Sequence, residues 1–375
     1  MLIQNACVYT EDFRFAKRDV RVINDRIDTV SSSPLRPYPV EEVIDAAGKW
    51  LIPGLTDIHF HGCVSYDTND ATEEALRAMA KYLRSCGVTT ILPTTMTLPK
   101  EEVRKIVRTA EAYSHTQKRD EAVIAGVNLE GPFISKDRVG AQNPLYVQEP
   151  DVDFIKKLQE ETGHFAKIIT VAPEVEKAME FIEELHDEIR ISIGHTMTDY
   201  ETAKEAYEKG AKHLTHMFNA MPGLQHRKPG PMAAAQEAED VTCEIICDGV
   251  HIHPAMIRTA FSMMGPEKMI LISDSCRAAG MPDGEYELGG QKIFKHDHAA
   301  FLEDGTLAAS ATNVFDCMVN AMDFGVPAED AIRAATYNPA RAAGILERYG
   351  SIEEGKKARM VLIDPKNHYR LVRVF

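Results

Sequence analysis

Six ionisable side chains directly follow short apolar runs of the sequence, at positions where β-strands would end. They are His59, His61, Glu130, His195, His216 and Asp274. Each one alone has an ordinary structural explanation, as a hydrogen-bonded core histidine, a turn carboxylate or a helix cap. If the strand ends meet, however, the buried imidazoles and carboxylates converge, and a divalent cation compensates the cost of burying them. Together the six residues therefore predict a metal centre.

The chemistry expected of this centre follows from its ligand types. His59 and His61 are two residues apart, so on an extended segment both side chains point to one side and can hold the same ion. Nitrogen and oxygen ligands without thiolate suit Zn²⁺, Fe²⁺, Mn²⁺ or Co²⁺, and we expect Zn²⁺ first among these. Because a divalent cation lowers the pKa of water, the predicted reaction is hydrolysis. Asp274 is then the residue that accepts the proton of water and passes it to a leaving amine.

The elements that must position these residues form a repeated pattern. From Pro53 to about Leu346, short apolar strands alternate with amphipathic helices, which is typical of a parallel sheet built from βα units. Eight strands are predicted, over residues 55–58, 88–92, 123–129, 167–171, 190–193, 213–217, 242–247 and 269–272. Eight such units fit a (β/α)8 TIM-like barrel, in which catalytic side chains lie at the carboxyl ends of the strands. A doubly wound open sheet is the alternative, but no glycine-rich dinucleotide turn follows any strand.

Both ends of the chain have a different sequence pattern from the barrel region. Residues 2–50 and the last eighteen residues contain short alternating or β-branched runs, which indicate small antiparallel strands. We therefore expect residues 1–52 and 348–375 to form one small β domain beside a catalytic barrel of residues 53–347. Within the barrel region, residues 284–307 read as a hairpin-like excursion with glycine-containing turns.

The charge of the chain argues against two classes of partner. Asp and Glu number 57 against 42 Lys and Arg, a net charge of −15 that opposes binding to nucleic acid or anionic membranes. No apolar run is long enough for a membrane helix, and the first residues do not resemble a secretion signal, so we expect a cytoplasmic protein. Seven cysteines without a CxxC pair indicate reduced core residues rather than disulfides or a thiolate zinc site.

Six ordered motifs together carry a resemblance that spans most of the chain. They are HxH at His59, LEGP at Glu130, GHT at His195, HMFNAM at His216, DGVHIHP at His251 and SD-x3-AAG-x-PDG at Asp274. The sequence resembles the N-acetylglucosamine-6-phosphate deacetylases, a branch of the amidohydrolase superfamily. The resemblance implies a metal-bearing (β/α)8 barrel with a small β-sandwich domain formed by both termini. It also implies a cytoplasmic homodimer of amino sugar metabolism.

The resemblance further implies a reaction and roles for individual residues. The reaction is the hydrolysis of N-acetyl-D-glucosamine 6-phosphate to D-glucosamine 6-phosphate and acetate. The main metal would be held by Glu130, His195 and His216, and a second metal by His59 and His61, so that one or two ions are expected. The substrate would be bound by Gln142, Asn219, the backbone of Ala220, His251 and Arg227, with Arg227 reaching in from the neighbouring subunit to the phosphate.

Two departures from the family pattern concern the substrate. Gln142 stands where the family often has histidine, and it can donate and accept hydrogen bonds but cannot titrate. Ser275, Cys276 and Arg277 stand where many members have small or apolar residues.

Two alternative functions remain open. One is an amidohydrolase that acts on a cyclic amide or an N-acyl amino acid. Many two-metal relatives of that kind have a bridging lysine at the end of the fourth strand, whereas here Lys167 begins that strand and Ala172-Pro173-Glu174 follows it. The other is a catalytically silent barrel used for assembly, since a fold does not dictate an activity. The complete set of ligands together with Asp274 favours an enzyme.

Overall fold

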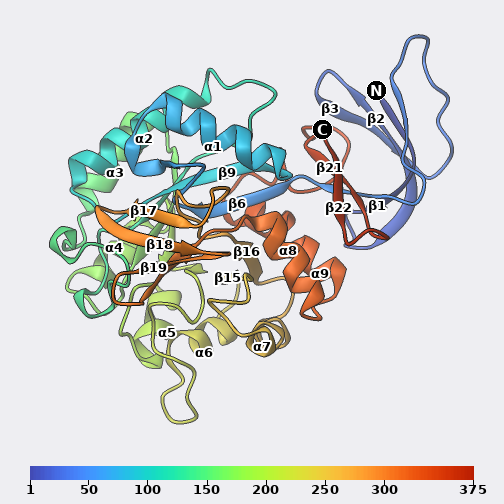
Figure 1. Cartoon of the computed structure of the whole chain (residues 1–375). Coiled ribbons are helices and arrows are strands. Elements are labelled where there is room, and N and C mark those ends of the chain that lie inside the picture. Colours follow the sequence, from blue (N-terminus) through green and yellow to red (C-terminus); the bar gives the residue numbers. More distant parts are fainter.

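The computed structural model describes all 375 residues and consists of a barrel with a smaller β domain at its side (Figure 1). Eight parallel strands form the barrel wall, and each of them except the last pairs with the barrel strand that follows it in the chain. They are β6 (Leu55–Phe60), β9 (Val88–Thr95), β11 (Val127–Glu130), β12 (Ala166–Val171), β13 (Arg190–Ile193), β14 (His213–Leu214), β15 (Thr242–Ile246) and β16 (Met269–Ile272). This arrangement confirms the predicted (β/α)8 barrel.

Amphipathic helices connect the strands and cover the outside of the barrel. They are α1 (Glu73–Ser85), α2 (Lys100–Ser114), α3 (Val152–Thr162), α4 (Ala178–Leu185), α5 (Tyr200–Glu208), α6 (Gly230–Glu237), α7 (Pro254–Met264), α8 (Val314–Asp323), α9 (Ala328–Ala335) and α10 (Tyr337–Ala342). In α1, for example, Leu76, Met79 and Leu83 are buried on one face, and the Thr72 hydroxyl caps the first turn. None of the helices is long and apolar enough to span a bilayer.

The barrel closes between its first and last strands without a continuous ladder, because β6 pairs only with β9 and β16 only with β15. Single hydrogen bonds join the two strands at their carboxyl ends instead. The Ser273 hydroxyl donates to the Asp57 carboxylate at 2.5 Å, and the Asp274 backbone N–H donates to the His59 carbonyl at 2.9 Å. This seam therefore places Asp274 directly beside the HxH segment.

Two strands are shorter than the sequence predicted. The predicted strand 123–129 is divided into β10 (Val123–Ile124) and β11, with Gly126 between them. A Cβ atom on Gly126 would lie 2.8 Å from the Phe165 carbonyl oxygen, so the two backbones approach closely there. The predicted strand 213–217 ends at Leu214 because the backbone turns, and His216 has a φ of 22°.

Strands from both termini share one sheet and one core, as predicted. The sheet has the order β22-β21-β5-β1-β2-β3 with β4 beside β1, and Ile3, Val20, Leu51 and Met360 are buried together against it. The strands are β1 (Leu2–Tyr9), β2 (Phe15–Ile23), β3 (Arg26–Ser31), β4 (Val43–Asp45), β5 (Trp50–Pro53), β21 (Met360–Asp364) and β22 (Arg370–Val374). The limits 1–52 with 348–375 and 53–347 stay our proposed domain boundaries.

The excursion after the last barrel strand is larger than the predicted hairpin. It is a four-stranded antiparallel sheet of β17 (Gly284–Leu288), β18 (Gln291–His296), β19 (Ala299–Leu302) and β20 (Leu307–Ser310). Its buried residues Leu288 and Ile293 pack with Met96 and Cys276 of the barrel loops. The sheet therefore lies on the same side of the barrel as the carboxyl ends of the barrel strands (Figure 1). A small hairpin of β7 (Gly62–Cys63) and β8 (Tyr66–Asp67) follows β6.

The barrel core supplies a test of this packing. Phe181 of α4 is fully buried and packs edge-on against Phe133, with the ring centroids 5.3 Å apart. We expect Phe181→Ala to lower the free energy of unfolding by about 3–5 kcal/mol, measured by urea denaturation, because it leaves a cavity. Leu145, which is 84% exposed, is the matched control, and Leu145→Ala should change stability by less than about 0.5 kcal/mol. Equal effects of the two substitutions would contradict this packing.

Candidate active site

Four imidazole rings surround one buried carboxylate at the carboxyl end of the barrel. Glu130 is the last residue of β11, and its Oε1 lies 3.0 Å from His195 Nε2 and 2.9 Å from His216 Nε2. The same oxygen lies 3.3 Å from His59 Nε2, and Oε2 lies 3.1 Å from His61 Nε2. All five residues are nearly or completely buried. The structure thus brings together every residue that the sequence predicted as a metal ligand.

The second nitrogen of each ring has an acceptor of its own. The Nδ1 atoms contact, at 2.9–3.2 Å, a Glu244 carboxylate oxygen (His59) and the backbone carbonyls of Thr94 (His61), Arg138 (His195) and Asn219 (His216). A carboxylate or carbonyl can only accept, so each Nδ1 carries a proton. The lone pair of each neutral ring is then on Nε2, which points to the centre of the site.

This donor set fits a divalent metal ion. His195 Nε2 and His216 Nε2 are 3.1 Å apart, and two lone pairs at that distance repel each other unless a cation lies between them. His59 Nε2 is buried and makes no hydrogen bond. The ligand atoms form two groups, each within 4.8 Å: one of His59, His61 and Asp274, and one of Glu130, His195 and His216. Two positions for a cation are thus available.

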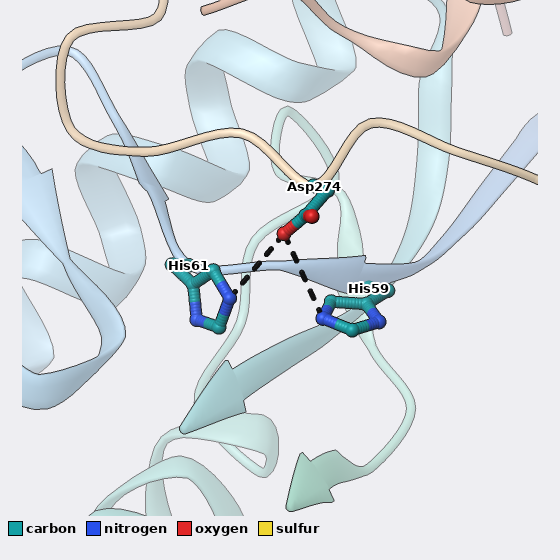
Figure 2. A group of neighbouring side chains, drawn as sticks. All are labelled: His59, His61 and Asp274. Atoms are coloured by element: carbon teal, nitrogen blue, oxygen red, sulfur yellow. Dashed lines mark ion pairs between the residues drawn. The ribbon is translucent and has the colours of Figure 1, made fainter. Parts of the chain in front are cut away.

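Asp274 follows β16 and faces the HxH segment (Figure 2). Its Oδ1 lies 3.4 Å from His61 Nε2 and 3.7 Å from His59 Nε2. Asp274 and His195 both have a φ of 47°, a left-handed conformation that few residues other than glycine adopt. Such conformations persist where the surrounding structure enforces them, and here they turn the side chains toward the barrel axis.

The electrostatics of the site favour positive charge. Burial opposes ionisation of Glu130, but His59 and His195 outweigh it and hold the pKa of the carboxyl well below its ordinary value. Burial likewise opposes the charged form of Asp274, yet contacts with His61 and His59 lower its pKa to about 2. Burial disfavours the imidazolium of His61, whereas Asp274 and Glu130 raise its pKa to about 10, so in the metal-free site Nε2 of this ring carries a proton in the place that a metal ion would take. Asp274 is therefore a carboxylate at neutral pH, in the state that can accept a proton.

A cavity of about 360 Å³ opens over these groups. Most residues predicted for the site line it, namely His61, Glu130, Gln142, His195, His216, Asn219, Ala220, His251 and Asp274. The far wall consists of Leu288 and residues 306–308 of the β17–β20 sheet. The cavity thus places space for a small substrate directly beside Asp274.

Two polar side chains of the cavity are held by neighbours. His251 Nδ1 donates to Asp248 Oδ2 at 2.6 Å, which leaves Nε2 for a substrate. The Gln142 carbonyl oxygen accepts from the Thr97 backbone N–H at 2.6 Å, and its amide donates to Glu130. Gln142 therefore supports Glu130 directly and has one N–H left for a ligand.

Arg227 is the one predicted substrate contact that lies away from this cavity within the chain. It is exposed and lines a separate hollow with Tyr200 and Lys228. Within one chain, Arg227 therefore does not line the cavity beside Asp274. Arg138, by contrast, lines the main cavity of its own chain.

Sequence reasoning missed three groups around the site. Glu244 and His213 lie below the predicted metal ligands, and the only sequence signal for them is a glutamate inside the apolar strand β15. Arg138 is one of several exposed basic residues, and nothing in its surroundings in the sequence marks it. The residues that the β17–β20 sheet contributes to the cavity wall carry no titratable groups, so no motif pointed to them.

Comparisons with known proteins agree with this geometry. A model of the amidohydrolase family matches residues 50–373. The chain belongs to the amidohydrolase family. It is 36% identical to the N-acetylglucosamine-6-phosphate deacetylase of Bacillus subtilis, over 97% of this chain and 93% of that protein. It is 31% identical to the N-acetylgalactosamine-6-phosphate deacetylase of Escherichia coli O157:H7, over 90% and 89% of the two chains.

A solved structure extends the likeness to the whole fold. It is an aspartate-to-alanine variant of the Mycobacterium smegmatis N-acetyl-D-glucosamine-6-phosphate deacetylase in complex with N-acetyl-D-glucosamine-6-phosphate. The match has a TM-score of 0.91 at 28% identity and covers 100% of this chain and 97% of that one. The resemblance predicted from the six motifs is confirmed, and the family together with the ligand geometry indicates a divalent metal.

The central position of Glu130 predicts the effect of removing metal. A ligand that binds only the native state stabilises it by about 2.7 kcal/mol when present at 100 times its Kd. A chelator should therefore lower the unfolding free energy of the natural protein by roughly that amount. It should have little effect on Glu130→Gln, which lacks the shared carboxylate, as thermal unfolding with and without EDTA will show. Glu149→Gln, on an exposed pair with Lys177, is the control that should respond to EDTA like the natural protein.

Proposed function

We propose that this protein hydrolyses N-acetyl-D-glucosamine 6-phosphate to D-glucosamine 6-phosphate and acetate. The observation that carries the proposal is the position of Asp274. This carboxylate lies within 3.7 Å of both histidines of the HxH segment and lines the cavity that also contains His251. The relatives at 36% identity and in the solved complex act on or bind this sugar phosphate, according to their names.

The residues of the chain divide the reaction between them. Glu130 and the four histidines would hold a divalent cation, which would supply Lewis acidity toward an amide carbonyl and lower the pKa of water. Asp274 accepts a proton from the attacking water and delivers it to the amide nitrogen as the C–N bond breaks. The acetyl carbon forms a new C–O bond to the water oxygen and is released as acetate. The nitrogen stays on the sugar as its amine. His251, fixed by Asp248, presents Nε2 to the acetyl oxygen or a sugar hydroxyl.

The proposal extends to the ion, the subunits and the location. We assign Zn²⁺ as the expected ion, with Fe²⁺, Mn²⁺ or Co²⁺ as alternatives of the same ligand preference, and two positions per chain. We further propose a cytoplasmic homodimer in which Arg227 of one subunit binds the phosphate in the other. Asn219 and the backbone of Ala220, which both line the cavity, would complete the phosphate site.

The structure gives no support to a carboxylated lysine of the kind expected for cyclic-amide hydrolases. Lys167 lies at the beginning of β12, and its Nζ donates to the His164 carbonyl at 2.8 Å. The strand ends at Val171 without a lysine, and Glu130 occupies the position between the two ligand groups. An N-acetylated amino sugar phosphate remains the best substrate class.

Replacement of the proposed proton carrier tests the chemistry. We expect Asp274→Asn to lower kcat by about 100- to 10,000-fold, because an amide cannot accept the proton of water. KM should change much less, and acetate release is the measurement. Asp187→Asn, at a side chain that is 94% exposed, should keep natural activity. A kcat for Asp274→Asn within tenfold of the natural value would refute the assigned role.

The phosphate contact is tested with two sugars and two arginines. The natural protein should release acetate faster from the phosphorylated than from the unphosphorylated sugar. A charge-assisted hydrogen bond contributes about 1.5–3 kcal/mol, so Arg227→Ala should lower kcat/KM for the phosphorylated sugar by about 10- to 100-fold. Arg138→Ala is the matched variant from the same chain. A larger loss with Arg138→Ala would assign the phosphate to that residue, and equal rates on both sugars would remove the phosphate site.

Mixed dimers test whether Arg227 acts across subunits. If Asp274→Asn and Arg227→Ala are made on separate chains, a mixed dimer contains one site with both groups intact. Random pairing should restore about one quarter of the natural activity. No recovery would contradict the trans contact. N-acetylgalactosamine 6-phosphate, the substrate named for the Escherichia coli relative, is the comparison that decides between the two epimers.

A further inference from the structure

A charged network lies directly beneath the metal ligands and has no part in the reaction steps described above. Glu244 is in the middle of β15 and is completely buried. An isolated carboxylate in such a place is very costly, so its partners must hold it there. Three donors surround it: the His59 ring, the His213 ring and the backbone N–H of His216.

The contact to His59 controls which nitrogen of that ring faces the site. Glu244 Oε2 lies 2.9 Å from His59 Nδ1 and can only accept a hydrogen bond. The Nδ1 proton is therefore fixed on the side of Glu244, and the Nε2 lone pair points toward Asp274 and Glu130. Carboxylate partners of this kind orient a ligand histidine and raise its basicity.

His59 differs in this respect from the other three rings. His61, His195 and His216 donate to neutral backbone carbonyls, at 3.2, 3.0 and 3.2 Å. Only His59 is anchored by a charged group, and charge-assisted hydrogen bonds are roughly twice as strong as neutral ones. The position formed by His59, His61 and Asp274 thus depends on one carboxylate beyond its own ligands.

Glu244 also contacts the other ligand group and is itself oriented. Its Oε2 accepts from the His216 backbone N–H at 3.1 Å, where the chain turns out of β14. Its Oε1 accepts from His213 Nε2 at 3.0 Å, and His213 Nδ1 lies 2.6 Å from the Thr242 hydroxyl. His213 is thus held by Thr242 on one side and fixes the carboxylate from below on the other.

We propose that Glu244, oriented by His213, is a positioning residue that gives the His59–His61–Asp274 position its affinity for a second divalent ion. The inference rests on the metal site of the proposed function and goes beyond it, because it makes occupancy of the second position depend on a residue outside the ligand set.

The test measures metal binding rather than turnover. Chelator-treated full-length protein is titrated with Zn²⁺ and with Co²⁺ against a chromophoric chelator, and the Co²⁺ absorption spectrum reports the ligand field. The natural protein should bind two ions. Glu244→Gln should weaken the second ion by about 10- to 100-fold, the usual effect of losing a partner of a ligand histidine, and weaken the first ion much less.

Two further variants separate positioning from general damage. Glu121 is also a completely buried carboxylate, but it holds Tyr113 and the Lys118 backbone far from the site. Glu121→Gln should keep both affinities even where it lowers thermal stability. His59→Ala should lose the second ion, and adding Glu244→Gln to it should weaken binding no further, because Glu244 acts through that ring.

The outcomes decide the proposal in either direction. It is overturned if Glu244→Gln binds both ions like the natural protein, if Glu121→Gln loses as much, or if the natural protein binds one ion only. If Glu244→Gln does not fold, His213→Gln takes its place, and unchanged affinity for the second ion then overturns the proposal. Acetate release by the natural protein, assayed alongside, reports separately on the proposed function.

Discussion

The structure depends above all on one buried carboxylate that is shared by four imidazole nitrogens. Glu130 lies within 3.3 Å of an Nε2 atom from each of four histidines, which come from three different strand ends. Without positive charge this arrangement would be severely unfavourable, because lone pairs and a carboxylate would face one another away from water. The second nitrogen of every ring is therefore anchored elsewhere, and the barrel wall supplies the anchors.

The incomplete ladder between β6 and β16 has a direct bearing on this arrangement. Other neighbouring strands of the barrel are joined by a ladder of backbone hydrogen bonds. Between β6 and β16, single hydrogen bonds from Ser273 and Asp274 join the two strands instead. Asp274 can therefore adopt its left-handed conformation and turn toward His61. Closure of the barrel and placement of Asp274, the proposed proton carrier, depend on the same few hydrogen bonds.

The sequence was sufficient for the barrel and for the convergence of the predicted ligand side chains, because residues at the carboxyl ends of parallel strands in a barrel must meet whatever the exact pairing. The sequence was insufficient where a contact depends on the register between strands or on how a loop folds. The pairing of Glu244 with His59 needs the register of β15 against distant β6, and no local pattern encodes it. The same holds for Gln142, whose contact with Glu130 depends on how a long loop folds back. Arg227 lies in a separate hollow outside the cavity of its own chain, and no local pattern in the sequence indicates that position.

In this enzyme, the reactive side chains of the cavity and the wall opposite them come from different segments of the chain, and the β17–β20 sheet supplies the wall. Every reactive side chain of the cavity comes from the barrel strands and their own loops, whereas Leu288 and residues 306–308 contribute an unreactive wall. That wall is a continuous insert with its own small core against Met96 and Cys276. Selection can therefore reshape the volume open to an acyl group or sugar by altering one segment, while the inherited hydrolytic apparatus stays untouched. Relatives that share the six motifs but differ in this insert are the natural places to look for changed selectivity.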